Sequence, residues 1–207
     1  MRELTEKEKK RAAKVAETRA EMEKAGWKAQ DVTLSVVRAN VYALLWLIPF
    51  AAVFIALFIL MGHTYDIESE RIESLLLLPV EMIAAIFVHE GLHGLTWGMF
   101  ASQHFKSIEF GFIKEMATPY CSCTEPLKRG VYLLGAFMPC LLLGLVPCVA
   151  AVFSGQVFML AFGLIMIGGA GGDLTIMLKM LTFKENKREV LYLDHPTECG
   201  FIALTRE

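Results

Sequence analysis

The sequence lacks the basic charge of nucleic-acid-binding proteins and the cysteine patterns of disulfide-rich and cysteine-based zinc proteins. Its net charge of −2 at pH 7 gives no basic excess of the kind that nucleic-acid-binding domains carry, so we expect no nucleic-acid partner. An odd number of cysteines with no Cys-x-x-Cys pair argues against a disulfide framework and a cysteine-based zinc site. Cys121 and Cys123 are therefore expected to be reduced structural thiols. The other three cysteines are Cys140, Cys148 and Cys199.

A secretory signal peptide is also not apparent, because the first apolar segment begins only after residue 40 and is long enough to span a membrane. Apolar residues make up 55% of the chain, and its mean hydropathy is +0.49. Soluble domains contain about 45–50% apolar residues. Residues 1–38 are highly charged, so the apolar excess lies in the remainder. These features indicate an integral membrane protein.

Four segments are long and apolar enough to cross a bilayer as helices, which takes about 20 residues. Only Ser154, Gly155 and Gln156 separate the third segment from the fourth, so these two must be antiparallel neighbours. We therefore predict a mainly α, polytopic membrane protein with four transmembrane helices. The four segments are residues 41–61, 74–101, 130–153 and 157–180.

The basic residues predict the orientation of these helices, because cytoplasmic loops carry most Lys and Arg. Residues 1–38 contain ten of the twenty basic residues, residues 102–130 contain four, and the chain from Lys179 onward contains five. The loop at residues 62–73 has only one, Arg71. We expect both termini to be cytoplasmic and the lipid bilayer to be that of the plasma membrane.

Outside the spans the sequence predicts three smaller features. Thr5 and Glu8 have the spacing of a helix capping box, and Gly26 is placed to end that N-terminal helix. Residues 31–37 are rich in β-branched side chains, which fits a short strand or an extended lead-in. Residues 105–124 alternate in part between apolar and polar, which predicts a short cytoplasmic β-hairpin between the second and third spans.

We accordingly divide the chain into three parts. Residues 1–38 are expected to form a charged cytoplasmic helix with its lead-in, and residues 39–181 a four-helix transmembrane domain. Residues 182–207 are expected to form a cytoplasmic tail.

The second span contains the motif His89-Glu90-Gly91-Leu92-His93. Four residues apart in a helix, His89 and His93 project from one face and can bind one metal ion, usually Zn²⁺. Glu90 lies beside them and can act as the general base of a hydrolytic reaction. A charged residue at the centre of a span costs about 2.5–3.5 kcal/mol, which favours a functional role over packing for this motif.

A hydrolytic zinc site needs a third protein ligand, and the fourth span offers Asp173. At 1.5 Å per residue, His89 lies roughly 22 Å and Asp173 roughly 24 Å from the start of its own span. Both spans run in the same direction, so the two residues are expected at similar depth. The surrounding glycines (168, 169, 171 and 172) permit close helix packing and a bend that aims the carboxylate. The alternative is a packing seam in which Asp173 pairs with a lysine.

Other ionisable residues are weaker candidates. Glu81 lies two turns before His89 and fits a polar cavity or the membrane interface better than a metal site. His104 and Glu109 are expected beyond the end of the helix. Asp194 and His195 can reach the mouth of the site, although a structural turn at Pro196 explains them more simply.

With its motif at 89–93, the Thr118-Pro119-Tyr120 stretch, Pro139, Asp173 after paired glycines, and Asp194-His195-Pro196, the chain resembles the putative zincin peptidase family of four-span membrane proteins. More distantly it resembles the site-2 protease class of intramembrane zinc proteases. That resemblance implies zinc bound by His89, His93 and Asp173. The chain departs from the class because Asp173 follows glycines and is followed by Leu174, where the class carries Leu-Asp-Gly after an Asn-Pro element.

The sequence thus predicts a membrane-embedded zinc-dependent endopeptidase, with Glu90 as general base and a peptide or membrane protein as substrate. Two alternatives stay open, a non-catalytic metal-binding scaffold or sensor and a zinc hydrolase acting on a lipid or another non-peptide amide.

Overall fold

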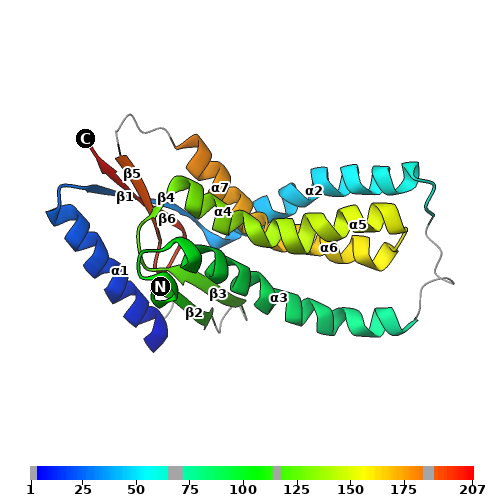
Figure 1. The fold of residues 1–207 in the computed structure, drawn as a ribbon, viewed down its shortest axis with the longest axis horizontal. Coiled ribbons are helices and arrows are strands. Elements are labelled where there is room, and N and C mark those ends of the chain that lie inside the picture. The colour runs from blue at the N-terminus through cyan, green and yellow to red at the C-terminus, as the bar shows by residue number, and fades with distance from the viewer. Residues whose placement is uncertain (1–3, 65–71, 114–117, 184–188) are drawn as a thin grey trace.

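The computed structural model describes residues 4–64, 72–113, 118–183 and 189–207 (Figure 1). The molecule is elongated and mainly helical, and the predicted helical class is confirmed. Long helices run along its axis, and a small antiparallel sheet lies at one end beside both termini. Most of the predicted 62–73 loop, including Arg71, lies outside the described residues.

Each of the four apolar segments forms helix. The first is α2 (Val36–Leu60) and the second is α3 (Ile72–Phe100). The third begins with α4 (Arg129–Pro139), passes through a π-helical turn (Cys140–Leu145) and continues as α5 (Val146–Ser154). Pro147 has no amide hydrogen to donate to Leu143, and the irregular turn lies directly before it.

The fourth segment is broken, not continuous. Helix α6 (Val157–Gly169) and helix α7 (Gly171–Thr182) meet at Ala170 with a bend of 48°. Glycine is the poorest helix former after proline, and four glycines flank this break. The bend predicted from these glycines is therefore present.

Within the described residues, two helices are long and apolar enough to cross a membrane, Val37–Leu60 and Arg129–Ser154. The bent pair of α6 and α7 is a third if the two helices form one span. Many large apolar side chains on these helices are exposed, as lipid-facing residues would be. Their inner faces pack on a buried cluster that includes Phe54, Phe58, Cys148 and Ile167. The count of four spans stays a prediction.

The predicted tail is not an irregular segment. Strands β5 (Glu189–Asp194) and β6 (Cys199–Arg206) pair with each other, and β6 also pairs with β1 (Lys28–Leu34). With β4 (Leu127–Lys128) they form one antiparallel sheet in the order β1-β6-β5-β4. Of the two alternatives for residues 31–37, a short strand is present as β1, but it begins at Lys28 and ends at Leu34, and residues 36–37 already belong to α2. The sequence did not predict β5 or β6. The two ends of the chain fold together.

The hairpin predicted between the second and third helices is confirmed. It consists of β2 (Ile108–Ile113) and β3 (Thr118–Cys123), which pair in antiparallel register after a short 3-10 turn at His104–Ser107. Helix α1 (Glu6–Lys24) begins with the predicted capping box of Thr5 and Glu8. It crosses the hairpin, where Lys14 pairs with Glu109 at 3.4 Å.

Helix α7 approaches α2 closely at Gly171. A Cβ atom at Gly171 would lie 2.3 Å from the Cα of Ala43 and 3.0 Å from its carbonyl oxygen, so backbone would have to move. The contact continues through a hydrogen bond of 3.2 Å from Trp46 Nε1 to Thr175 Oγ1. The start of α7, and with it Asp173, is therefore fixed by packing against α2.

Gly171→Ala is expected to destabilise the protein by about 1–3 kcal/mol, because overpacking forces the two helices apart. Thermal unfolding of the detergent-solubilised protein measures this as a Tm several degrees lower. Gly169→Ala is the matched control, because a Cβ atom there meets nothing within 4 Å. Its Tm should stay unchanged or rise slightly, and an equal loss in both variants would show that helix contact is not the cause.

Candidate metal centre

The two histidines of the motif lie together on the inner face of α3. Their ring centroids are 4.9 Å apart, and the side chains of His89 and His93 are only 11% and 5% exposed. The helix spacing predicted this common face. Both imidazoles are turned away from the exposed side of α3 toward helices α4 and α7, where a buried metal could be held.

Asp173 completes the group from the first turn of α7. Its Oδ2 lies 3.2 Å from Nε2 of His89 and 3.5 Å from Nε2 of His93. The potential ligand atoms of these three residues all lie within 4.8 Å of one another. The predicted convergence of the second and fourth apolar segments is therefore present. Within the described residues the ion-pair partners of Asp173 are these two histidines and not the lysine of the alternative.

The hydrogen bond at Nδ1 of His93 determines which of the two ring nitrogens can bind a metal. Nδ1 of His93 lies 2.9 Å from the carbonyl oxygen of Gly135. A carbonyl oxygen can only accept, so Nδ1 carries the proton, and in a neutral ring Nε2 bears a lone pair. That lone pair faces the carboxylate of Asp173. A cation, or a second proton on the imidazole, must lie between them.

The neighbours of His93 match those of a metal ligand. Metal-binding histidines usually donate their other N–H to a carbonyl or carboxylate, as His93 does to Gly135 on α4. The ring of Trp97 stacks on His93 at a centroid distance of 5.1 Å. A Cβ atom at Gly135 would collide with Trp97 Nε1 at 2.0 Å, so only glycine allows this approach. The imidazole is thus locked in one orientation.

Donor type and spacing both fit zinc. Two imidazole nitrogens and one carboxylate oxygen are a known catalytic donor set, and a fourth position stays open for water. Bonds of about 2.0–2.1 Å to one tetrahedral ion hold two ligand atoms about 3.3–3.4 Å apart. The distances of 3.2 and 3.5 Å from Asp173 Oδ2 to the two histidine Nε2 atoms bracket that value.

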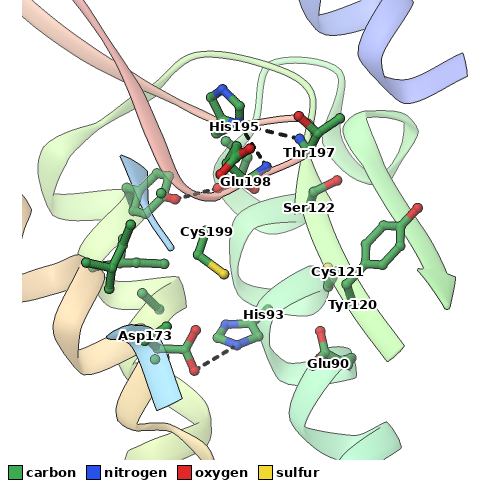
Figure 2. A pocket seen from close by; sticks show the side chains of 18 of the residues that line it. Glu90, His93, Tyr120, Cys121, Ser122, Asp173, His195, Thr197, Glu198 and Cys199 are labelled. Carbon is green, nitrogen blue, oxygen red and sulfur yellow. Dashed lines mark hydrogen bonds and ion pairs between the residues drawn. The ribbon is translucent and has the colours of Figure 1, made fainter. Parts of the chain in front are cut away.

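Glu90 lies next to this group and faces β3 of the hairpin. The backbone N–H of Cys121 donates to its carboxylate. Glu90, His93 and Asp173 all line one cavity of about 320 Å³. Figure 2 shows Glu90 and the His93–Asp173 pair at the base of this cavity, with Cys121 and Tyr120 along one side. A base, a metal-type cluster and space for a ligand therefore coincide.

The chain after β5 forms the wall of the cavity that faces this base. Figure 2 places His195, Thr197, Glu198 and Cys199 across from the base. Nδ1 of His195 accepts the N–H of Glu198 at 2.9 Å, and burial lowers the pKa of His195, so its ring is neutral at neutral pH. A structural turn is thus present here, but the His195 ring forms it and not an Asp side chain, and His195 also lines the cavity.

Asp194 has a role that the sequence did not reveal. Its Oδ2 accepts the N–H of Cys123 at 2.7 Å, and its Oδ1 accepts the hydroxyl of Tyr132. Burial raises the pKa of Asp194, although both hydrogen bonds and Arg11 act in the opposite direction. Asp194 and Glu90 thus hold two alternate N–H groups on the same edge of β3. Few backbone N–H groups on that edge of β3 are therefore left to form hydrogen bonds with a bound peptide in strand conformation.

The weaker candidates lie elsewhere. Glu81 lines a separate cavity between α3 and the α5–α6 pair, apart from the metal-type group, but this cavity is mostly apolar and not the polar cavity expected. In the part of the chain that the structure describes, neither His104 nor Glu109 belongs to a metal-type group. Sequence reasoning missed Arg11, Tyr132 and Gly135. No local pattern marks them, because they reach the site through long-range packing.

One comparison with known proteins gives a match. The model of a family described as "Putative zincin peptidase" matches residues 82–187, which is half of the chain and contains His89, Glu90, His93 and Asp173. No curated protein and no solved structure matches the chain. The more distant resemblance to site-2 proteases therefore stays a prediction.

Proposed function

Because this chain belongs to the putative zincin peptidase family, we propose that it is a membrane-embedded zinc-dependent endopeptidase that hydrolyses peptide bonds at or within the membrane. The observation that carries the proposal is the approach of two imidazole Nε2 atoms to one carboxylate oxygen, at 3.2 and 3.5 Å, inside a cavity that Glu90 also lines. We assign His89, His93 and Asp173 as the zinc ligands.

The residues around the ligands supply the remaining parts of a hydrolytic site. Zinc bound here would polarise the scissile carbonyl and the attacking water. The Glu90 carboxylate takes a proton from that water and passes it to the leaving amine. The N–H of Cys121 holds this carboxylate at the cavity wall, and the carbonyl of Gly135 holds the tautomer of His93.

The membrane placement is part of the proposal. The apolar helices and the distribution of Lys and Arg support four spans with both termini in the cytoplasm. The sheet, the hairpin and α1 gather at the end of the molecule that carries the termini (Figure 1). In this orientation the metal centre lies toward the cytoplasmic side, and peptide segments would reach it from there or from the bilayer.

Metal removal tests this function. Protein purified in detergent is expected to cleave members of a mixed peptide library, to lose that activity with a zinc chelator and to regain it with added Zn²⁺. Mass spectrometry of the peptide products measures cleavage, and the metal content is measured on the same samples. Protein that binds zinc at one ion per chain but leaves peptides and co-expressed membrane proteins intact would instead favour the non-catalytic scaffold or sensor.

A further inference from the structure

A buried arginine lines the cavity that holds the metal-type group. Arg11 comes from α1, far from the motif in sequence, yet it lines the same cavity as Glu90, His93 and Asp173. It is only 7% exposed, whereas its neighbours Lys9 and Lys10 are exposed to solvent. The burial of a charged group in this place calls for a partner.

The contacts of Arg11 position its guanidinium without neutralising it. The group lies over the ring of Tyr120 at 4.1 Å, Nη1 donates to Ser122 Oγ at 3.5 Å, and Nη2 donates to the carbonyl of Pro196. All of these partners are uncharged. The side chain is therefore clamped between the hairpin and the loop after β5.

Arg11 lacks an anionic partner in the described part of the chain. Within the described residues the contacts of its guanidinium are with Tyr120, Ser122 and Pro196 and include no carboxylate, and its buried Nε has no hydrogen-bond partner. Asp194 is close enough to be influenced by Arg11, but its oxygens are taken by Tyr132 and Cys123. An arginine fork presents five N–H donors and matches a carboxylate in geometry and charge.

We propose that Arg11 is a carboxylate-binding subsite of the peptidase, which selects substrates that carry a carboxylate near the scissile bond. This inference rests on the proposed function, since it names the substrate class of that same site. The cavity of about 320 Å³ joins Arg11 to the metal centre and is at the small end of ligand pockets, which span about 300–1,000 Å³.

The carboxylate has two possible sources, an Asp or Glu side chain and the C-terminus of a peptide. Both present the same two oxygens to Arg11. Four matched versions of each peptide distinguish them: Glu or Gln at one internal position, each with a free or an amidated C-terminus.

Affinity selection tests the inference without requiring cleavage. Zinc-loaded Glu90→Gln protein in detergent is incubated with the matched peptide library, and retained peptides are quantified by mass spectrometry. Peptides with the recognised carboxylate should be retained at least about tenfold better than their neutral partners, the scale of one charged hydrogen bond. Adding Arg11→Gln should abolish that preference, and Arg11→Lys should keep part of it. Lys10→Gln, which removes an exposed positive charge one residue away, should leave it unchanged.

The outcomes separate the inference from the function on which it rests. Equal retention of acidic and neutral peptides, or a preference that survives Arg11→Gln, would overturn the carboxylate subsite even if the wild-type protein cleaves peptides. An Arg11-dependent preference without any cleavage by wild-type protein would keep the subsite and count against the peptidase. If Arg11→Gln does not fold, as a changed Tm and elution profile would show, Arg11→Lys takes its place: a reduced preference for the Glu peptide keeps the subsite, and an unchanged preference overturns it.

Discussion

Asp173→Ala is expected to strip zinc from the purified protein and to abolish peptide cleavage. Asp173 supplies the only carboxylate oxygen in the group formed with His89 and His93. Mutation of a residue that only hydrogen-bonds to a metal ligand already lowers metal affinity by about 10–100-fold, and loss of a direct ligand should lower it more. Elemental analysis after detergent purification measures this as a fall from one zinc ion per chain to near none.

The control for Asp173→Ala is His104→Asn. His104 is a potential ligand by residue type but lies outside the metal-type group, and asparagine tolerates its positive φ of 52°. Its zinc content should match that of the wild type. Zinc retained at full occupancy in Asp173→Ala would show that the aspartate is not a ligand and that the group is held together by hydrogen bonds alone.

Glu90→Gln is expected to lower the rate of cleavage by about 100- to 10,000-fold, the range attributed to general acid–base catalysis. Glutamine keeps the size of the side chain and can still accept the N–H of Cys121, but it cannot take a proton from water. Because Glu90 is not assigned as a ligand, zinc content and Tm should stay at wild-type values. The ratio of cleavage rates at equal zinc occupancy is the quantity to measure.

Glu81→Gln provides the comparison for Glu90→Gln. Both residues are acids of α3, but Glu81 lines the separate cavity beside α5 and α6. Its replacement should leave cleavage of soluble peptides unaffected. A Glu90→Gln protein that cleaves at the parental rate would remove Glu90 from the mechanism while leaving the zinc site intact.

The metal-type group could be predicted from sequence because its determinants are local or simple. Helix spacing alone places His89 and His93 on one face. The high cost of an acid in lipid singled out Asp173, and the helical rise placed it at the depth of His89. The glycines next to Asp173 predicted a bend, which is present at Ala170.

The rest depends on contacts between distant segments. Strand β6 pairs with β1 across most of the chain, and no local pattern encodes that pairing. The sequence therefore predicts only a tail at residues 182–207, although it does predict turns there. Arg11 has the same composition around it as the solvated lysines of α1, so only packing distinguishes it. Gly135 contributes only its backbone carbonyl and has no side chain, so the sequence does not identify it as part of the site.

X-ray absorption at the zinc edge of the purified wild-type protein tests the central claim most directly. We predict one zinc ion per chain with nitrogen and oxygen ligands at about 2.0–2.1 Å, scattering from two imidazoles and no sulfur shell near 2.3 Å. A spectrum with sulfur ligands, or protein that cleaves peptides without zinc, would contradict a centre built from His89, His93 and Asp173.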